Sequence, residues 1–251
     1  MIELSGFSKS YTGSKNRFAA SNVSITAADG EITGLIGVNG AGKTTIIKAA
    51  AGLHFASAGS VRIDLNDTAT VSAEILRRSV GFVPDKSRFP KNLTAAEYLD
   101  FTAECYGLSG KEKEAAMKRV VGECFLGGQL SKKIAALSKG YCKRLAFAAA
   151  IVHRPHNIIL DEPFEGLDPE QIIHFRELIK KLSRKCAVLL STHIMSEAQF
   201  LCSKIYVVSG GKIAASGTAQ SIASLYGAQN LEEAFLKITS QSKAGRSADE
   251  K

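Results

Sequence analysis

The chain has 251 residues, of which 45% are hydrophobic and 22% charged, with 22 Gly and 5 Pro. This composition is that of an ordinary globular domain and excludes collagen-like, coiled-coil and disordered chains. The longest stretch without Asp, Glu, Lys or Arg, 49–61, is shorter than the ~20 apolar residues of a membrane span, so none is predicted. The N-terminus lacks the pattern of a signal peptide. An odd number of cysteines without a C-x-x-C pair argues against a zinc site or disulfides and favours a reducing cytoplasm.

The net charge of +8 is concentrated in one internal segment. Residues 77–154 contain 15 Lys and Arg but only 7 Asp and Glu, and the rest of the chain is neutral. A basic segment can face nucleic acid, anionic lipid or the cytoplasmic loops of a membrane protein. The alternative is a solvated helical face with no partner.

The first part of the chain is predicted to be rich in strands, because short apolar or alternating runs are bounded by turn residues. The predicted strands cover 23–26, 31–37, 60–65 and 80–83. The second of these is followed by a glycine-rich turn and a predicted helix, 43–51, which Gly52 ends.

A predicted helical block follows, with helices over 94–106, 111–124 and 138–152, in which Thr94 and Ser138 are the expected N-caps. We interpret this block, about 86–154, as an inserted helical subdomain. Strands at 157–160, 187–191 and 205–208 then alternate with helices at 169–185 and from 194 onward. This alternation predicts an α/β domain with a mostly parallel sheet over residues 1–238. The polar tail 239–251 is expected to be disordered.

The segment Gly37-Val38-Asn39-Gly40-Ala41-Gly42-Lys43-Thr44 fits G-x-x-x-x-G-K-[ST] between a predicted strand and a predicted helix. In this motif, backbone N–H groups surround a phosphate chain at the positive end of a helix. Lys43 is expected to reach the β- and γ-phosphates, and Thr44 to bind Mg²⁺. The alternative is a glycine-rich turn with an incidental lysine. The predicted nucleotide-binding residues here are Asn39, Gly40, Ala41, Gly42, Lys43, Thr44 and Thr45.

An apolar strand ends in two adjacent carboxylates, Asp161 and Glu162. An acid at the end of a neighbouring parallel strand can hold Mg²⁺ through water, which is the role expected of Asp161. Glu162 is then placed to deprotonate an attacking water.

Further motifs follow in order: Leu137-Ser138-Lys139-Gly140 before a helix, Gly166-Leu167-Asp168 after the acids, and Thr192-His193 after the last core strand. Tyr11 lies 26 residues before Gly37. With these motifs, the chain resembles the ATP-binding subunits of ABC transporters over nearly its whole length. The resemblance implies a P-loop NTPase core, an N-terminal antiparallel β portion and the helical insert.

The resemblance also implies a role for each motif. Leu137, Ser138, Lys139 and Gly140 match the family's signature, Asp168 its D-loop, His193 its switch histidine and Tyr11 its adenine-stacking aromatic residue. Two copies then pack head to tail, so that the signature of one copy closes over the γ-phosphate of the ATP held by the other. The implied ligands are ATP and Mg²⁺, and the dimer can be homomeric or heteromeric.

The chain departs from the commonest family pattern at two positions. Asp85 stands where most members have glutamine; it can ligate Mg²⁺ or a water and adds negative charge beside ATP. In the signature, Lys139 replaces glycine and Tyr141 replaces glutamine. These changes and the ending Leu231–Leu236 resemble exporter subunits that pair with a separate membrane permease. The resemblance therefore implies an energy-coupling subunit at the cytoplasmic face of a membrane, which docks its permease near 85–93.

Alternatives remain for several assignments. Ser138 can be only a helix cap, His193 a core histidine, and Tyr11 an exposed loop residue with Phe18 nearby. The alternative function is a soluble ABC ATPase that uses the basic segment to act on nucleic acid or ribosomes. A single domain without a coiled-coil or zinc insert opposes this function, so no nucleic-acid partner is expected. A P-loop kinase or GTPase is opposed by the signature, by His193 and by the lack of an [NT]-K-x-D motif.

Overall fold

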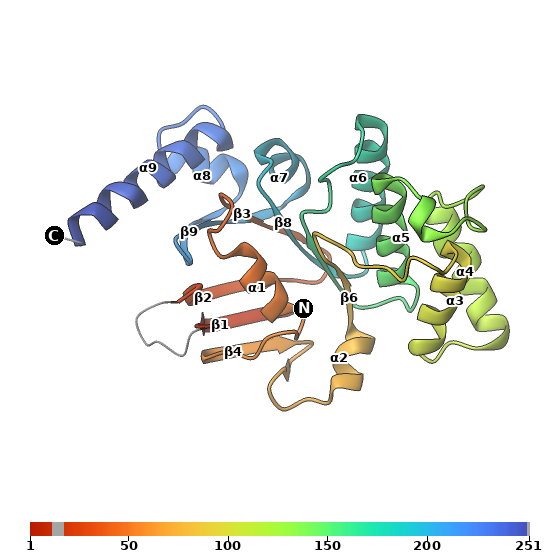
Figure 1. Ribbon diagram of the computed structural model, residues 1–251. Helices are drawn as coiled ribbons and strands as arrows, with labels where there is room; N and C mark the ends of the chain where they lie inside the picture. The colour runs from red at the N-terminus through yellow and green to blue at the C-terminus, as the bar shows by residue number, and fades with distance from the viewer. Residues whose placement is uncertain (12–17, 250–251) are drawn as a thin grey trace.

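The structure is a computed structural model that describes residues 1–11 and 18–249, with side chains up to residue 240. It contains two sheets with helices between and around them (Figure 1). The smaller sheet has the order β2-β1-β4-β5 and is antiparallel throughout. Its strands are β1 (Ile2–Lys9), β2 (Ala20–Ala27), β4 (Ala58–Ile63) and β5 (Asn66–Asp67). The predicted antiparallel portion near the N-terminus is therefore present.

The larger sheet has the order β10-β9-β3-β8-β7-β6. All neighbouring strands in it are parallel except β10, which pairs with β9 in the antiparallel sense. The carboxyl ends of the parallel strands meet at one edge of the sheet, where polar residues that follow them are brought together. The strands are β3 (Ile32–Ile36), β6 (Val80–Val83), β7 (Asn157–Asp161), β8 (Ala187–Thr192), β9 (Lys204–Ser209) and β10 (Lys212–Gly217).

The larger sheet is buried on both faces. In β7, Ile159 packs into the cluster shared with the small sheet and with the helix α1 (Lys43–Ala50), whereas Ile158 and Leu160 pack on the opposite face. This alternation is the period of two expected for strand side chains. Continuous apolar strands of this kind are typical of a parallel sheet covered on both sides. The helix α1 lies between the two sheets in Figure 1 and directly follows β3.

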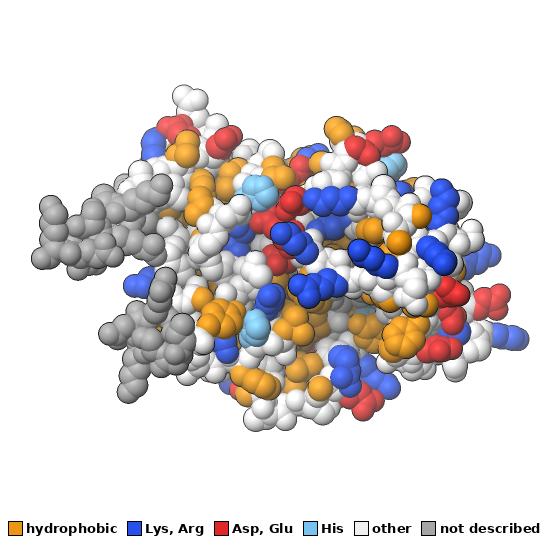
Figure 2. All heavy atoms as spheres, viewed as in Figure 1, with side chains coloured by type: hydrophobic (Ala, Val, Ile, Leu, Met, Phe, Trp, Pro, Cys, Tyr) orange, Lys and Arg blue, Asp and Glu red, His pale blue; other side chains and the backbone are white. Residues whose placement is uncertain are grey.

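The helical block contains α3 (Ala95–Cys105), α4 (Gly110–Glu123) and α5 (Lys139–Ile151), close to the predicted bounds. Thr94 and Glu97 form a reciprocal capping box at the start of α3, and the Ser138 hydroxyl accepts from the N–H of Tyr141 at the start of α5. These three helices lie together at one end of the molecule (Figure 1). Figure 2 shows that Lys and Arg side chains gather over this half of the viewed face, with acidic side chains among them.

The remaining helices are α2 (Ala73–Ser79), α6 (Pro169–Ser183), α7 (Met195–Leu201), α8 (Ala219–Leu225) and α9 (Leu231–Asp249), with a 3₁₀ turn at Ile134–Ala136. Most of the remaining helices pack on the same face of the large sheet as α5, opposite α1, whereas α2 packs beside the small sheet. In residues 1–11 and 18–249 we find no helix with the length and apolarity that crossing a membrane requires.

The segment from residue 239, which the sequence predicts to be disordered, begins inside the last helix, because α9 spans Leu231–Asp249.

Candidate nucleotide-binding site

The glycine-rich loop joins the end of β3 to the start of α1 and has a backbone that only glycine adopts easily. Gly40 and Gly42 have φ angles of 79° and 108°, in the left-handed region. A Cβ atom on Gly42 would lie 2.5 Å from the carbonyl oxygen of Ala19. The loop therefore passes close to neighbouring backbone and leads into the N-terminus of a helix, where free N–H groups favour an anion.

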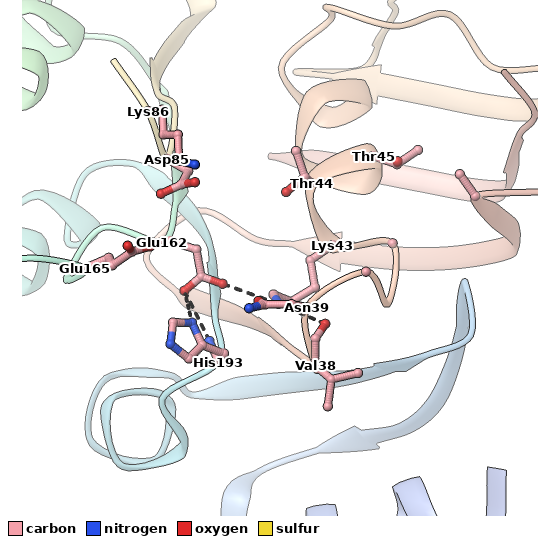
Figure 3. A pocket seen from close by; sticks show the side chains of 13 residues that line it. Val38, Asn39, Lys43, Thr44, Thr45, Asp85, Lys86, Glu162, Glu165 and His193 are labelled. Carbon is pink, nitrogen blue, oxygen red and sulfur yellow. Dashed lines mark hydrogen bonds and ion pairs between the residues drawn. The ribbon is translucent and has the colours of Figure 1, made fainter. Parts of the chain in front are cut away.

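A cavity of about 580 Å³ opens at this loop (Figure 3). It lies at the carboxyl edge of the parallel strands and is lined by residues from the loop, from α1 and from the ends of β6, β7 and β8. The lining residues are Ala19, Val38, Asn39, Gly40, Gly42, Lys43, Thr44, Thr45, Asp85, Lys86, Glu162, Glu165 and His193.

Lys43 and Glu162 face each other in this cavity. The buried Lys43 Nζ donates to the carbonyl oxygen of Gly37 at 2.7 Å and lies 3.3 Å from Glu162 Oε1. Removing two charges from water is costly unless they are paired and hydrogen-bonded, which this arrangement achieves. The structure thus brings together the predicted phosphate-binding lysine and the predicted general base.

His193 contacts the other oxygen of the same carboxylate. Its Nδ1 lies 2.9 Å from Glu162 Oε2, and its backbone N–H donates to that oxygen at 3.2 Å. Glu162 itself has a φ angle of 48°, which is uncommon for a residue other than glycine. Its side chain is therefore fixed by a strained backbone on one side and by Lys43 and His193 on the other.

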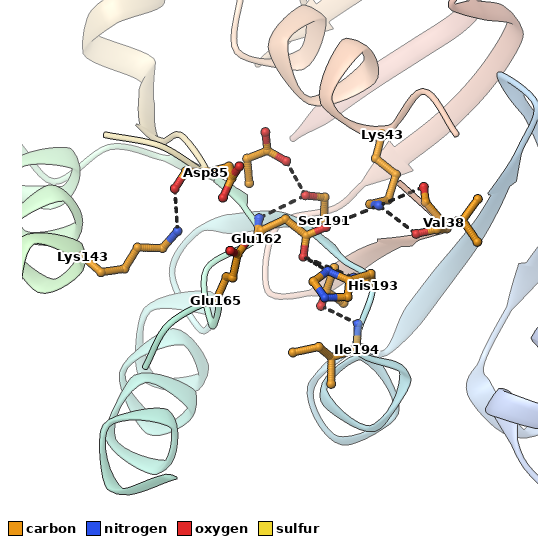
Figure 4. Close-up of polar contacts among 12 residues, drawn as sticks. Val38, Lys43, Asp85, Lys143, Glu162, Glu165, Ser191, His193 and Ile194 are labelled. Carbon is orange, nitrogen blue, oxygen red and sulfur yellow. Dashed lines mark hydrogen bonds and ion pairs between the residues drawn. The ribbon is translucent and has the colours of Figure 1, made fainter. Parts of the chain in front are cut away.

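Asp161 lies one residue before Glu162 but is almost fully buried. The Ser191 hydroxyl on the adjacent strand β8 donates to Asp161 Oδ1 at 2.5 Å. The backbone N–H of Glu162 in turn lies 3.2 Å from Ser191 Oγ (Figure 4). Ser191 thus ties the ends of β7 and β8 together and fixes the direction of both acids.

Asp85 enters the cavity from the segment that follows β6, next to Glu165. Burial raises the pKa of Asp85, and the negative charge of Glu165 raises it further. Burial also tends to raise the pKa of Glu165, but the charge of Lys139 and the Asp85 side chain lower it below its usual value. Lys143, on α5, donates from Nζ to the carbonyl oxygen of Asp85 at 3.2 Å.

The signature residues Leu137, Ser138, Lys139 and Gly140 are not part of this cavity's lining as the described residues define it. Ser138 caps α5, so the alternative of a helix cap is also true of it. A Cβ atom on Gly140 would collide with the Gln171 side chain at the start of α6. Asp168 caps α6 by accepting from the N–H of Gln171 at 2.9 Å. Within one chain the signature therefore packs against the segment that contains Asp168.

Tyr11 lies beside the glycine-rich loop rather than in the cavity. Its hydroxyl is 3.3 Å from Thr45 Oγ1, and its ring meets that of His54 edge-on, with 5.6 Å between centroids. The ring is largely exposed, which leaves a face accessible to a planar ligand.

Four residues at the site were not predicted from the sequence. Ala19, Lys86 and Glu165 line the cavity, and Lys143 contacts its wall. Glu165 could have been predicted to lie at the site, because it is an acid only three residues after Glu162. Lys143 could not have been predicted, since its position in a helix does not reveal which loop it faces.

The fold and site define an ATP-binding cassette, and comparisons with known proteins agree. Residues 20–165, more than half of the chain, match the family described as ABC transporter. The chain is 31% identical to the ABC transporter ATP-binding protein NatA of Bacillus subtilis (strain 168), over 94% of this chain and 97% of the relative. It is also 31% identical to the Nod factor export ATP-binding protein I of Mesorhizobium japonicum, over 88% of this chain and 64% of that protein.

Two solved structures extend the similarity to three dimensions. One is an ATP-binding subunit of an ABC transporter, with a TM-score of 0.86, 31% identity and coverage of 95% of this chain and 99% of that one. The other is the dimeric ATP-binding cassette MJ0796 in a post-hydrolysis state with ADP and Pi, with a TM-score of 0.80, 25% identity and coverage of 87% and 98%. The chain belongs to the ABC transporter family and is an ATP-binding ATPase. The family resemblance and fold class predicted from the sequence are confirmed.

Proposed function

We propose that this chain is the ATP-hydrolysing subunit of a membrane exporter. It works as a head-to-tail dimer docked on a separate permease at the cytoplasmic face of the membrane. The observation that carries this proposal is that one short segment borders two sites. Asp85 and Lys86 line the nucleotide cavity, whereas Pro84 and the run Ser87–Phe89 line a second, aromatic groove. A partner that moves this segment from the groove therefore moves a wall of the nucleotide cavity.

The groove is small, about 160 Å³, and its lining combines aromatic side chains with the polar residues Ser87, Arg88 and Thr102. Phe89 and Tyr98 meet edge-on with 5.1 Å between centroids, and Tyr106 forms another wall. The floor is made of α5 alanines, which leave room for an inserted residue. Amphipathic helices dock into grooves through a few apolar anchor residues, and the aromatic rings here offer a place for one anchor of a cytoplasmic permease helix.

Hydrolysis follows from the residues that line the cavity. Lys43 is placed to pair with phosphate oxygens, and Glu162 to accept a proton from the attacking water. His193 holds the Glu162 carboxylate and, with a second ring nitrogen, is placed to reach the γ-phosphate. Bound Mg²⁺ would neutralise phosphate charge, and Thr44, Asp85 and Asp161 are the residues that would hold it directly or through water.

The residues present fit a Mg²⁺ site in which the protein provides a few oxygen ligands and the phosphates of the substrate provide others. Thr44 and Asp85 offer oxygen donors across the cavity from each other (Figure 3). In the part of the chain that the structure describes, no three His, Cys, Asp or Glu side chains are grouped so as to hold a metal alone. Mg²⁺ usually keeps waters and binds through one or two carboxylates together with substrate phosphates, which matches this sparse donor set.

Head-to-tail pairing explains why the signature lies outside the cavity of its own chain. Ser138 and Gly140 would close over the nucleotide held by Lys43 and Thr44 of a second copy, and Asp168 would link the two sites. ATP would then join the subunits, and its hydrolysis would let them separate. The relatives' names support transport, and that of the Mesorhizobium protein supports export.

The alternative function on nucleic acid is less well supported, because several cations of the basic segment are already used inside the fold. Lys113 pairs with Asp100 and Glu104, each at 2.8 Å. Arg119 binds the last carbonyls of α5 and pairs with Glu123. Such contacts fit a helical subdomain that is stabilised by local ion pairs rather than a phosphate-binding surface.

The proposal is tested by purifying tagged Glu162→Gln chain from its native host with ATP and Mg²⁺ in mild detergent. Loss of the general base should lower turnover about 10²- to 10⁴-fold while ATP binding and ATP-dependent dimers remain. A membrane protein in near-equal amount should co-purify. Ribosomes or nucleic acid in a membrane-free fraction, or an active monomeric variant, would contradict the proposal.

A second variant separates docking from hydrolysis. Phe89→Ala on the Glu162→Gln chain should release the membrane protein but keep ATP binding. Phe55→Ala, which removes an exposed ring outside the groove, is the matched control and should keep both. Equal capture by the two variants would contradict docking at the groove.

A further inference from the structure

Lys139 belongs to the signature but makes its contacts inside its own chain. Its Nζ lies 3.5 Å from Glu165 Oε1. Its stem crosses Gly166 so closely that a Cβ atom there would lie 2.6 Å from Lys139 Cε. Because Gly166 has a φ angle of 77°, the absence of a side chain serves both the turn and this crossing.

Glu165, the partner of Lys139, is part of the nucleotide cavity and neighbours Asp85 there. Both carboxylates line the same cavity, where neighbouring like charges repel unless cations flank them. Lys139 flanks Glu165, and Lys143 flanks Asp85, whose carbonyl oxygen it binds at 3.2 Å (Figure 4).

A set of charges thus runs from the start of α5 to the wall of the cavity, with the two carboxylates between the two lysines. Lys139 and Lys143 are four residues apart and so lie on one side of α5. The side chain of Lys143 is nearly fully buried, so its position is fixed, whereas Lys139 is 68% exposed and Glu165 44% exposed. Lys139 is therefore the adjustable member of the set.

We propose that Lys139 is a positioning residue in the nucleotide site of its own chain: it holds the Glu165 carboxylate beside Gly166, and so keeps this acidic wall of the cavity in place beside ATP. This inference rests on the proposed binding of ATP and Mg²⁺ next to Asp85. It assigns Lys139 a contribution in cis that is separate from any contact with the nucleotide of a second copy.

The test is a double-mutant cycle on nucleotide affinity. A fluorescent ATP analogue with Mg²⁺ is titrated into dilute protein, at a concentration at which the chain is monomeric by light scattering. The variants are Lys139→Met, Glu165→Gln, the double variant, Lys139→Arg as the charge-preserving form and Lys132→Met as a control lysine in the same subdomain. Melting curves check that each variant is folded.

Lys139→Met should weaken the analogue's affinity about two- to fivefold, the range of a partly exposed ion pair. Lys139→Arg and Lys132→Met should stay close to wild type. In the Glu165→Gln background, Lys139→Met should have no further effect, because the charge on which it acts is gone. Steady-state kinetics should show the same change mainly in KM rather than in kcat.

An equal loss of affinity with and without the Glu165 charge would overturn the proposal, because Lys139 would then act without Glu165. Unchanged affinity of the monomer together with reduced turnover of the dimer would also overturn it, in favour of a role only in trans. If wild-type chain failed to bind the analogue, the nucleotide site itself would be refuted, which is a separate outcome.

Discussion

The nucleotide site and the helical subdomain hold their residues in place by different means. Around the cavity, functional side chains extend from strand ends and are fixed across strands, as Ser191 fixes Asp161. In α3 and α4 several polar contacts instead lie within one helix, as in the capping box of Thr94 and Glu97 or the pair Arg119–Glu123. Contacts between distant segments specify one geometry, whereas local contacts specify a helix and leave its orientation to packing.

The two regions are joined mainly through α5, which packs on β6 and contributes most of its side chains to the shared core. This difference suggests that the site is rigid within the sheet, and that the subdomain moves as a body whose internal contacts persist. The following predictions test that view, beginning with the largest expected effect.

Phe147→Ala should have the largest effect on stability, because it removes a fully buried ring at the junction between the helical subdomain and the rest of the fold. Phe147 on α5 meets Phe175 on α6 edge-on, with 5.2 Å between centroids. Its truncation should lower the free energy of unfolding by about 3–5 kcal/mol in urea titrations. Phe101→Ala, on the exposed side of α3, is the control and should change it by less than about 0.5 kcal/mol. Similar effects of both variants would mean that α5 does not join the regions.

Lys43→Met should affect the site alone. Loss of the lysine removes charge-assisted contacts to phosphate and should weaken ATP binding about 10- to 100-fold, measured by calorimetry. Lys48→Met, on the same helix but outside the cavity lining, should bind like wild type. Unchanged affinity of the Lys43 variant would show that the loop binds phosphate through its backbone only.

His153 should make the subdomain's junction with β6 sensitive to acid. Its ring stacks on Tyr106 at 3.6 Å between centroids, and burial lowers its pKa to about 4 from 6.5. The unfolded chain therefore takes up the proton first, so the stability is complete above about pH 6.5 and falls as the pH approaches about 4. His153→Phe should lose less stability than wild type over this range. An identical pH profile for both proteins would exclude His153 as a cause.

Thr94→Ala should have the smallest effect and the most local one. Loss of the cap should destabilise α3 by about 1 kcal/mol, seen as faster hydrogen exchange in that helix with unchanged ATP affinity. Thr218→Ala, which removes the comparable cap of α8, should speed exchange there instead. Faster exchange throughout the molecule after Thr94→Ala would argue against local stabilisation of the subdomain.

The parts of the fold that could be predicted are those in which local sequence and tertiary structure agree. The apolar runs of β3, β7 and β8 and the capped helices α3 and α5 were all found. The strand β1 was missed, because register shifts after Leu4 and at Phe7 interrupt its alternation. The short helices α2 and α8 and the edge strand β10 form only against neighbours, so their isolated sequences carry a weak signal.

The site was predictable where motifs follow the carboxyl ends of neighbouring parallel strands, as for Lys43, Glu162 and His193. The position of Asp85 could be predicted, but not its setting between Glu165 and Lys143. Lys143 and Glu165 lie 58 and 80 positions after Asp85 in the sequence, and only the tertiary packing of α5 and the loop after β7 brings them beside it.

The way in which α5 is held in the fold determines how a movement at one point of the helix is transmitted to another. It has 13 residues and is thus ~20 Å long. Arg119 grips its C-terminal carbonyls at Ile151 and Val152, and Ala146 in its last half lines the aromatic groove. Ser138 lies at the opposite, N-terminal end of the helix. If α5 rotates as a rigid body about its contacts with Arg119, Ser138 lies about 2.5 times as far from the pivot as Ala146. A displacement of ~1 Å at Ala146 then becomes a displacement of roughly 2.5 Å at Ser138. A small displacement at the groove would thereby become large enough at Ser138 to make or break a hydrogen bond to phosphate.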